Sequence, residues 1–301
     1  MSTSEFQRRR SAIKKIIVGS LSVGTAAQAF SGISSAKRQD TNYHMKGNIN
    51  HSVCKWCYGS IPLEEFCVAA KKMGISAVDL IGPKDWSTLK KHGLYSSMCN
   101  GAEISIEKGF NDRQYHSTLV KNYLEMIPLV AQAGYTQLIC FSGNKGNFDD
   151  ETAWENCTEG LKKIMSTAEK HKVTIVMELL NSKIDHKDYH CDKTAWGVAL
   201  AKRVGSENFK LLYDIYHMQI DEGDVIRTIR EYHPYFSHYH TGGVPGRREI
   251  DESQELYYPA IMKAIIDTGF KGFVAQEFVP TPKDAAGQLA SLEKAVRICD
   301  V

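Results

Sequence analysis

Several features that define other classes of protein are scarce in this 301-residue sequence. Its 8 cysteines are too few for a small scaffold held together by disulfides. Neither charge is in large excess, with 37 basic and 35 acidic residues, and no linker rich in proline, glycine or serine is present. With 43% hydrophobic and 24% charged residues, the chain has enough apolar side chains for a large core and too much charge for a polytopic membrane protein. This composition and length predict a globular protein of one large α/β domain or two smaller domains.

Acidic residues are almost absent from the first forty positions, where Glu5 is the only acid before Asp40. Five basic residues precede a mildly apolar run at 16–30, and residues 9–14 read Arg-Arg-Ser-Ala-Ile-Lys. This segment resembles the twin-arginine signal, which directs bacterial export of folded proteins, often with a cofactor. We therefore expect residues 1–40 to be an export signal and linker, and the mature protein to be periplasmic. A general secretory signal and a basic amphipathic tail are the alternatives.

The apolar run at 16–30 is also too short for a permanent membrane anchor. Glycines and serines interrupt it, whereas a stable spanning helix needs roughly 20 apolar residues. Cleavage after Ala29 would remove five basic residues and one acidic residue, which changes the formal net charge from +2 to −2. Because nucleic-acid binding needs a cationic surface, this charge argues against a DNA or RNA substrate.

From about residue 46 onward, short apolar runs alternate with longer segments in which apolar residues recur every three to four positions. The predicted strands span residues 47–51, 77–80, 94–98, 137–141, 174–178, 210–214, 236–240 and 273–277. The clearest predicted helices span residues 62–73, 114–133, 152–171, 194–204, 257–268 and 285–299. Gly74, Gly134 and Gly269 each follow a helical segment, where glycine can adopt the left-handed conformation that ends a helix.

Eight strand-and-helix units over residues 41–301 predict a single (β/α)₈ barrel, since that number of units matches both the fold and its size. An open doubly wound sheet is the main alternative. Such sheets usually carry a glycine-rich phosphate loop after the first strand, and residues 50–55 contain no glycine. The barrel is therefore the favoured architecture.

Polar residues close four successive predicted strands, at Glu178, Asp214, His240 and Glu277. The active site of such a barrel lies at the carboxyl ends of its strands, so these side chains are expected to converge. Three converging carboxylates repel one another unless a cation lies among them, and a neutral imidazole is a further ligand. The four residues thus predict a site for one divalent metal ion. Three oxygen ligands and one nitrogen favour Mn²⁺, Mg²⁺ or Co²⁺ over a structural zinc ion.

Residues 213–219, which read Tyr-Asp-Ile-Tyr-His-Met-Gln, carry the most specific resemblance to a known family. Together with residues 177–181, 238–242 and 276–278, they resemble the hydroxypyruvate isomerase group of the xylose-isomerase-like barrels, and the likeness covers residues 46–300. The resemblance implies that Glu178 and Glu277 both bind the metal and transfer protons, and that Asp214 and His240 complete the metal ligands. It further implies that His217 and Arg247 bind the oxygens of the substrate.

Two further residues are candidates for contact with a small sugar or hydroxyacid substrate. Asn181 lies in the matching segment after the fifth strand, and Trp56, in the loop after the first strand, is expected to form a wall of the pocket or to pack as an ordinary aromatic residue. A homo-oligomer is possible, and the sequence does not specify one. The stretch at 185–190, rich in histidine, is expected to be a solvated loop, which in the family crosses the mouth of the site.

The resemblance implies isomerisation of hydroxypyruvate to tartronate semialdehyde. A carbon-bound proton is removed, an enediolate forms, and the proton returns to the neighbouring carbon. Three alternatives stay open. The segment His240-Thr241-Gly242 is closer to the pattern of ketose 3-epimerases, a non-catalytic carbohydrate-binding barrel would use the same fold, and the superfamily also contains a metal-dependent endonuclease. Cys54 and Cys57 have the spacing of a redox motif but lack its structural context, so a local disulfide and free thiols are both possible.

Overall fold

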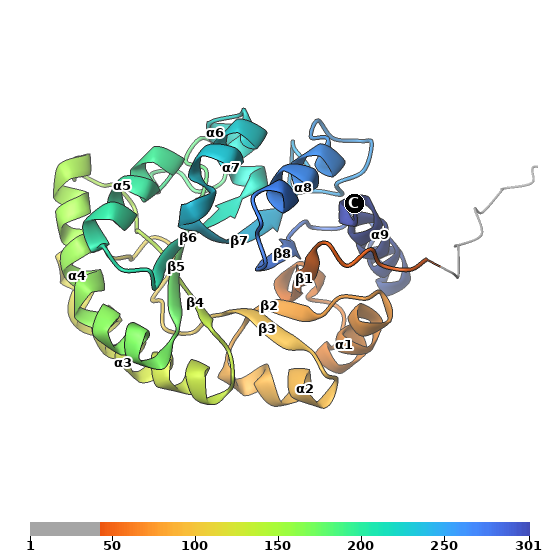
Figure 1. Ribbon diagram of the computed structural model, residues 1–301, viewed down its shortest axis with the longest axis horizontal. Coiled ribbons are helices and arrows are strands. Elements are labelled where there is room, and N and C mark those ends of the chain that lie inside the picture. Colours follow the sequence, from red (N-terminus) through yellow and green to blue (C-terminus); the bar gives the residue numbers. More distant parts are fainter. Residues whose placement is uncertain (1–42) are drawn as a thin grey trace, which may run out of the picture. The chain divides into compact units, whose positions relative to one another are not determined.

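The computed structural model describes residues 43–301, and His44–Val301 form one compact unit, shown in Figure 1. The predicted export signal lies outside the described residues. Within residues 43–301, no helix combines the length and apolar character required to cross a membrane.

Eight parallel strands form a closed barrel in the order in which they occur along the chain. The first strand, β1, pairs with both β2 and β8, which closes the barrel. The strands are β1 (Asn50–Cys54), β2 (Ala77–Ile81), β3 (Tyr95–Cys99), β4 (Gln137–Cys140), β5 (Thr174–Glu178), β6 (Phe209–Asp214), β7 (Phe236–Thr241) and β8 (Phe273–Gln276). The predicted (β/α)₈ architecture is confirmed.

The α-helices surround this barrel, because each apolar stripe can be buried only against the outer face of the strands. They are α1 (Leu63–Lys72), α2 (Trp86–Lys91), α3 (His116–Gln132), α4 (Asp150–His171), α5 (Thr194–Val204), α6 (Ile215–Asp221), α7 (Val225–Tyr232), α8 (Tyr258–Asp267) and α9 (Ala285–Cys299). The six predicted helices are all present. Gly74 and Gly134 adopt φ angles of 83° and 84° after their helices, which confirms their expected role in helix termination.

The position of the first strand differs from the prediction. The sequence predicted residues 47–51, whereas β1 spans Asn50–Cys54. Gly47 has a φ of 77° and lies in a bend before the strand, and the buried residues of the strand run from His51 to Cys54. Cys54 therefore ends a barrel strand and does not lie in the following loop.

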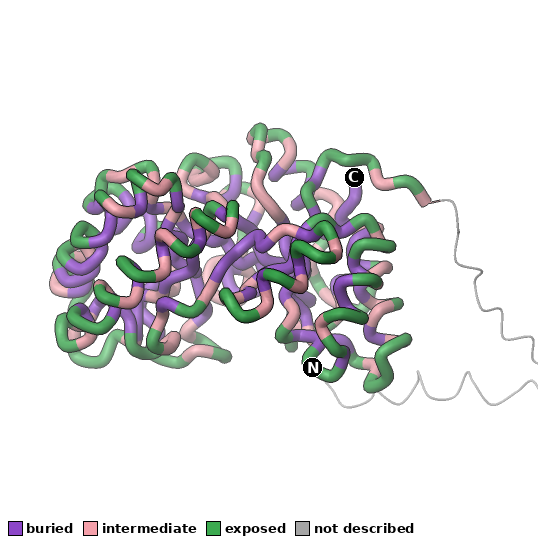
Figure 2. The backbone as a smooth tube through the Cα atoms, turned by 90° about the horizontal axis from the view of Figure 1, so that it is seen from below, coloured by how far each residue is buried: buried purple, intermediate pink, exposed green. Residues whose placement is uncertain are grey.

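Two groups of side chains fill the interior of the barrel. An apolar half comes from β3 to β6 and consists of Met98, Ile139, Val176 and Leu212. A polar half comes from β1, β2, β3 and β7 and consists of Ser52, Asp79, Ser97 and His238, none more than 1% exposed. Figure 2 shows the buried chain running along the strands and the inner helix faces, with exposed positions outside. The polar half is unusual because barrel interiors are dominated by branched apolar side chains.

Candidate metal centre and active site

The four predicted metal ligands lie together at one end of the barrel. Glu178, Asp214 and His240 occupy the carboxyl-terminal parts of β5, β6 and β7, and Glu277 directly follows β8. One ligand atom from each of the four lies within 4.8 Å of the others. All four residues are at most 4% exposed. The parallel strands thus bring together residues that are up to 99 positions apart in the sequence.

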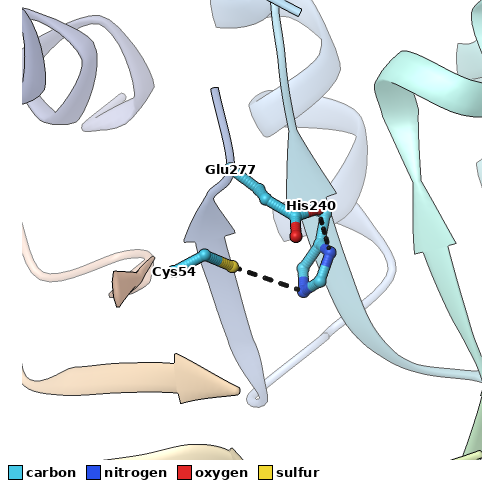
Figure 3. Close-up of side chains that lie close together, drawn as sticks. All are labelled: Cys54, His240 and Glu277. Atoms are coloured by element: carbon cyan, nitrogen blue, oxygen red, sulfur yellow. Dashed lines mark hydrogen bonds and ion pairs between the residues drawn. The ribbon is translucent and has the colours of Figure 1, made fainter. Parts of the chain in front are cut away.

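The His240 imidazole lies between two different environments. Its Nδ1 atom is 2.7 Å from Glu277 Oε2 and 3.1 Å from Glu178 Oε1. Its Nε2 atom is 3.1 Å from Asp79 Oδ1 and 4.0 Å from Cys54 Sγ. Figure 3 shows the ring between the Glu277 carboxylate and the Cys54 thiol. The Nδ1 edge therefore faces the predicted metal ligands, and the Nε2 edge faces the interior of the barrel.

Burial and mutual repulsion strongly perturb the acids of this cluster. Burial raises the pKa of Asp214 to about 8, with Arg247 opposing this shift and Glu277 adding to it. Burial also favours the protonated form of Glu277, but the charges of Arg247 and His240 together hold its pKa well below the ordinary value. Burial opposes a charge on His240, yet the neighbouring Glu277 raises its pKa well above the ordinary value. These shifts show that the carboxylates of one buried cluster compete for the positive charges of Arg247 and His240.

This cluster fits a divalent cation. Glu178 Oε1 is buried and makes no hydrogen bond within residues 43–301. Buried polar atoms are almost always hydrogen-bonded or bound to an ion or water. Three carboxylates and one imidazole are also a donor set typical of Mn²⁺, Mg²⁺ and Co²⁺.

Arg247 lies beside the acids and between two aromatic rings. Its Nη2 atom is 3.3 Å from Asp214 Oδ2, and its guanidinium lies 5.2 Å from the ring centre of Trp56 and 5.4 Å from that of Tyr216. Trp56 Nε1 donates a hydrogen bond of 2.7 Å to Glu277 Oε1. Because Trp56 remains 49% exposed, it joins the buried acids to the solvent-facing surface. The structure thus places both predicted residues at the cluster.

His217 also borders the cluster, and its hydrogen bonds define its tautomer. Asn181 Oδ1 accepts hydrogen bonds from the backbone N–H groups of Ile184 and Asp185, so its Nδ2 is the atom that donates to His217 Nδ1, at 2.6 Å. The proton of the neutral imidazole therefore lies on Nε2, 3.6 Å from Asp214 Oδ2. Burial lowers the pKa of His217 well below the ordinary value, which keeps the ring neutral. His217 can thus donate a hydrogen bond from a buried, uncharged ring.

Asn181 is placed to orient His217. Its Nδ2 also donates to Asp185 Oδ2 at 2.7 Å, and the residue is fully buried. Tyr216 donates to the same Asp185 oxygen at 2.8 Å, which ties this loop to α6. Direct contact between Asn181 and a substrate stays a prediction.

Two expectations about neighbouring loops are resolved. Cys54 and Cys57 are free thiols and both are buried, so they form no local disulfide. The expectation of a solvated loop at 185–190 is wrong at its end, because Tyr189 and His190 are at most 3% exposed. Tyr189 donates to the backbone oxygen of Glu178 at 3.0 Å, which anchors the loop to the end of β5.

The sequence pattern did not identify Asp79, His238 and Cys54, which lie next to the predicted ligand His240. Asp79 interrupts the apolar run of β2, and His238 precedes His240 by two residues on the same face of β7. A charged residue within a buried strand was the available signal for Asp79. Cys54 was missed because the first strand was predicted three residues too early.

Comparisons with known proteins agree with this fold. A protein of Mus musculus named as a hydroxypyruvate isomerase is 31% identical over 241 residues, which cover 75% of this chain and 87% of the relative. A Homo sapiens protein of the same name is 32% identical over 122 residues, which cover 40% of this chain and 44% of that relative. The alignment thus spans less than half of the human protein. A D-psicose 3-epimerase of Ruminiclostridium cellulolyticum is 31% identical over 133 residues, which cover 43% of this chain and 42% of the relative.

A solved structure has the same architecture. The crystal structure of AP endonuclease, family 2, from Brucella melitensis superimposes with a TM-score of 0.68 at 25% sequence identity. The match covers 79% of this chain and 96% of that one. Residues 68–295 match the family described as the xylose isomerase-like TIM barrel. Together with the closed barrel and the cluster at its strand ends, this match shows that the chain belongs to the xylose isomerase-like TIM barrel family.

Proposed function

We propose that this protein is a metal-dependent isomerase that interconverts hydroxypyruvate and tartronate semialdehyde through an enediolate. The observation that carries the proposal is the buried convergence of Glu178 and Glu277 with Asp214 and His240. Two carboxylates among further metal-binding groups are what a proton transfer between adjacent carbons requires. The isomerase names of the mouse and human relatives support the same reaction type.

Glu178, Asp214, His240 and Glu277 would hold the ion. When bound, a divalent ion supplies a Lewis acid that stabilises negative charge developing on the substrate oxygens. The donor set allows Mn²⁺, Mg²⁺ and Co²⁺.

The two glutamates carry the proton transfer in this proposal. One carboxylate removes a proton from the hydroxymethyl carbon of hydroxypyruvate, and the resulting electron pair forms the enediolate. The other glutamic acid gives a proton to the former carbonyl carbon, while the hydroxyl proton moves from one substrate oxygen to the other. Each correctly placed acid or base contributes about 10² to 10⁴-fold to the rate.

The remaining residues bind and shield the substrate. The His217 Nε2–H group donates to a substrate oxygen without bringing a charge, because Asn181 holds the neutral tautomer. The Arg247 guanidinium pairs with a negatively charged substrate oxygen. Trp56 and Tyr216 stack on Arg247 and limit its contact with water, which strengthens that pairing.

A ketose 3-epimerase is the second candidate. The segment His240-Thr241-Gly242 on and after β7 favours it, because this segment is closer to the pattern of ketose 3-epimerases, and the 31% identical D-psicose 3-epimerase supports it. Both reactions use the same proton chemistry and differ in which carbon each glutamate reaches.

Deuterium incorporation distinguishes these candidates. Metal-stripped protein is supplemented with Mn²⁺, Mg²⁺ or Co²⁺ and incubated in D₂O with hydroxypyruvate or free ketoses, and NMR follows which carbon gains deuterium. We expect metal-dependent labelling of the hydroxymethyl carbon of hydroxypyruvate, with tartronate semialdehyde as product. Labelling of ketose carbon 3 alone would identify an epimerase. Absence of exchange with every metal and substrate would favour a non-catalytic carbohydrate-binding barrel.

We also propose that residues 1–40 direct export to the periplasm. The twin-arginine pattern at residues 9–14 supports this proposal. In a bacterial host, the full chain is expected in the periplasmic fraction and a chain that begins at Asp40 in the cytoplasm, with equal specific activity. Replacement of Arg9 and Arg10 by lysine should block export, and unchanged export of that variant would contradict the proposal.

A further inference from the structure

Asp79 is a buried carboxylate at the centre of the polar half of the barrel. It is fully buried on β2 and lies 3.1 Å from the predicted metal ligand His240. Burying an unpaired charge costs free energy, so the partners of Asp79 indicate the role of its carboxylate. Those partners come from β1, β3 and β7, and the two carboxylate oxygens divide them into two sets.

The Oδ2 atom faces the interior of the barrel. It accepts a hydrogen bond of 2.6 Å from Ser97 Oγ and lies 2.8 Å from His238 Nε2. Ser97 is in turn hydrogen-bonded to Ser52. These contacts fix the carboxylate in position.

The Oδ1 atom faces the candidate metal centre. It lies 3.1 Å from His240 Nε2 and 3.7 Å from Cys54 Sγ. An ionised carboxylate can only accept, so the His240 proton on this side lies on Nε2. By the same rule Nδ1, which lies 2.7 Å from Glu277 Oε2, carries a second proton while no ion is bound. Loss of that proton leaves the Nδ1 lone pair directed at the cluster formed by Glu178, Asp214 and Glu277. A ring nitrogen must be unprotonated to bind a metal ion, so this tautomer is the one that the site needs.

From this geometry we propose that Asp79 is the positioning residue that makes His240 a metal ligand, by holding its Nε2–H group and directing its Nδ1 lone pair at the ion. The inference rests on the proposed metal-dependent function. In this proposal Asp79 acts through His240 and binds neither the ion nor the substrate itself. Carboxylates that hold a metal-binding imidazole in this way typically change metal affinity 10- to 100-fold when they are replaced.

The other two strand-borne ligands provide an internal comparison. Directly below Glu178 and Asp214, two residues earlier on the same strand faces, lie Val176 and Leu212. A carboxylate can bind a cation through either oxygen and needs no choice of tautomer. The imidazole alone requires a partner, and polar side chains are concentrated beneath the imidazole.

The test is Mn²⁺ binding to purified full-length protein, followed by electron paramagnetic resonance. The Asp79→Asn variant keeps the shape of the side chain and removes its charge. We expect its Mn²⁺ affinity to fall 10- to 100-fold and the nitrogen hyperfine coupling between Mn²⁺ and His240 to change. Ser97→Ala is the matched control, since it removes a partner of Oδ2 and leaves Oδ1 in place, and its affinity should stay within about twofold. Equal losses in both variants would overturn the proposal, because they would reflect a general loosening of the barrel.

A double-mutant comparison separates positioning from folding. In a His240→Gln background the imidazole is absent, so Asp79→Asn should cause no further loss of Mn²⁺ affinity. If Asp79→Asn does not fold, nitrogen NMR of the wild-type imidazoles with Mg²⁺, assigned with His240→Gln, replaces it. A proton on His240 Nε2 is expected, and a proton on Nδ1 overturns the proposal. Wild-type protein that binds no divalent ion would refute the proposed function, whereas unchanged Mn²⁺ binding by Asp79→Asn would refute this inference alone.

Discussion

The apolar and polar halves of the barrel interior lie on the same eight-stranded barrel, yet they differ in side-chain chemistry. In the apolar half, Val176 and Leu212 are fully buried and pack with other apolar side chains. In the polar half, the equally buried Asp79 contacts two histidines and a serine. Burial is the same in both halves, so burial does not account for the chemical difference between them.

The energetics of the two halves also differ. Burying an apolar side chain the size of leucine stabilises a fold by about 1.5–3 kcal/mol. Replacing a buried charged network by well-packed apolar residues is often neutral or stabilising. The polar half is thus poorly explained by stability alone. Its contact with His240, the one imidazole among the predicted ligands, connects it to the proposed metal site.

The largest effect is expected at the two glutamates at the strand ends, Glu178 and Glu277. Glu178→Gln and Glu277→Gln should each reduce turnover by about 10² to 10⁴-fold, because an amide can coordinate an ion but cannot accept the proton. The variant that lacks only the returning acid should still exchange substrate deuterium without forming product. Steady-state turnover and NMR in D₂O measure both quantities.

Glu255 serves as a control for these substitutions. Its side chain accepts a hydrogen bond from Gln219 at an exposed position. Glu255→Gln should leave turnover unchanged. Near-normal turnover of both Glu178→Gln and Glu277→Gln would remove the chemical basis of the proposed reaction.

A substitution in the apolar half should separate stability from metal binding. Leu212→Ala removes a fully buried side chain two residues before Asp214, and large-to-small core changes of this type cost about 2–5 kcal/mol of unfolding free energy. Mn²⁺ affinity of the folded variant should stay close to the wild-type value. Urea unfolding and Mn²⁺ titration test this expectation. A 10-fold loss of affinity in folded Leu212→Ala would break the functional distinction between the two halves.

A second buried histidine, His51 on β1, provides a comparison with His240 on β7. His51 is buried and lies 3.9 Å from Asp300 Oδ1; burial lowers its pKa to about 4, with Asp300 opposing the shift. Between about pH 6.5 and pH 4 the unfolded chain therefore binds a proton that the folded chain does not, so stability falls as pH decreases through this range. The loss attributable to His51 is about 2 kcal/mol between pH 7 and pH 5.

The His51→Asn variant isolates this contribution from that of the carboxylates. Urea unfolding at pH 7 and pH 5 should show a smaller decrease in stability for His51→Asn than for the wild-type chain. Equal decreases in the two proteins would show that His51 does not carry this pH dependence.

The smallest effect is expected at the exposed edge of the site. Trp56→Phe removes the hydrogen bond to Glu277 Oε1 but keeps an aromatic ring beside Arg247. The lost bond is worth about 1 kcal/mol, so kcat/KM should fall about fivefold. Mn²⁺ affinity should change less than in Asp79→Asn. If Trp56→Phe lowered Mn²⁺ affinity more than Asp79→Asn, the exposed Trp56 would contribute more to metal binding than the buried Asp79.

Much of the fold could be predicted from the sequence because alternation of strands and helices is a local pattern. The limits of β5 were predicted correctly, and polar residues at the ends of apolar strands identified Glu178, Asp214, His240 and Glu277. Their convergence followed from the rule that parallel barrel strands end on one face. Segments α2, α6 and α7 were not among the clearest predicted helices, since at 6, 7 and 8 residues they contain only about two turns each.

The layer beneath the ligands could not be predicted in the same way. The β2–β3 pairing shifts register on both sides of Asp79, and Leu80 adopts a φ of 54°, so strand periodicity alone does not give the direction of the Asp79 side chain. The orienting role of Asn181 likewise depends on backbone N–H groups in the following loop. Both features arise from tertiary contacts that leave no periodic signal in the sequence.

The proposed metal dependence of the isomerase is tested by measuring turnover as a function of bound metal. Protein stripped with a chelator is titrated with Mn²⁺ while hydroxypyruvate isomerisation and bound metal are measured in the same samples. The proposed function predicts negligible turnover without metal, and activity that rises in proportion to bound ion up to one ion per chain; Asp214→Ala should lose both turnover and bound metal. Full turnover of the metal-stripped protein in excess chelator would contradict the proposed metal dependence.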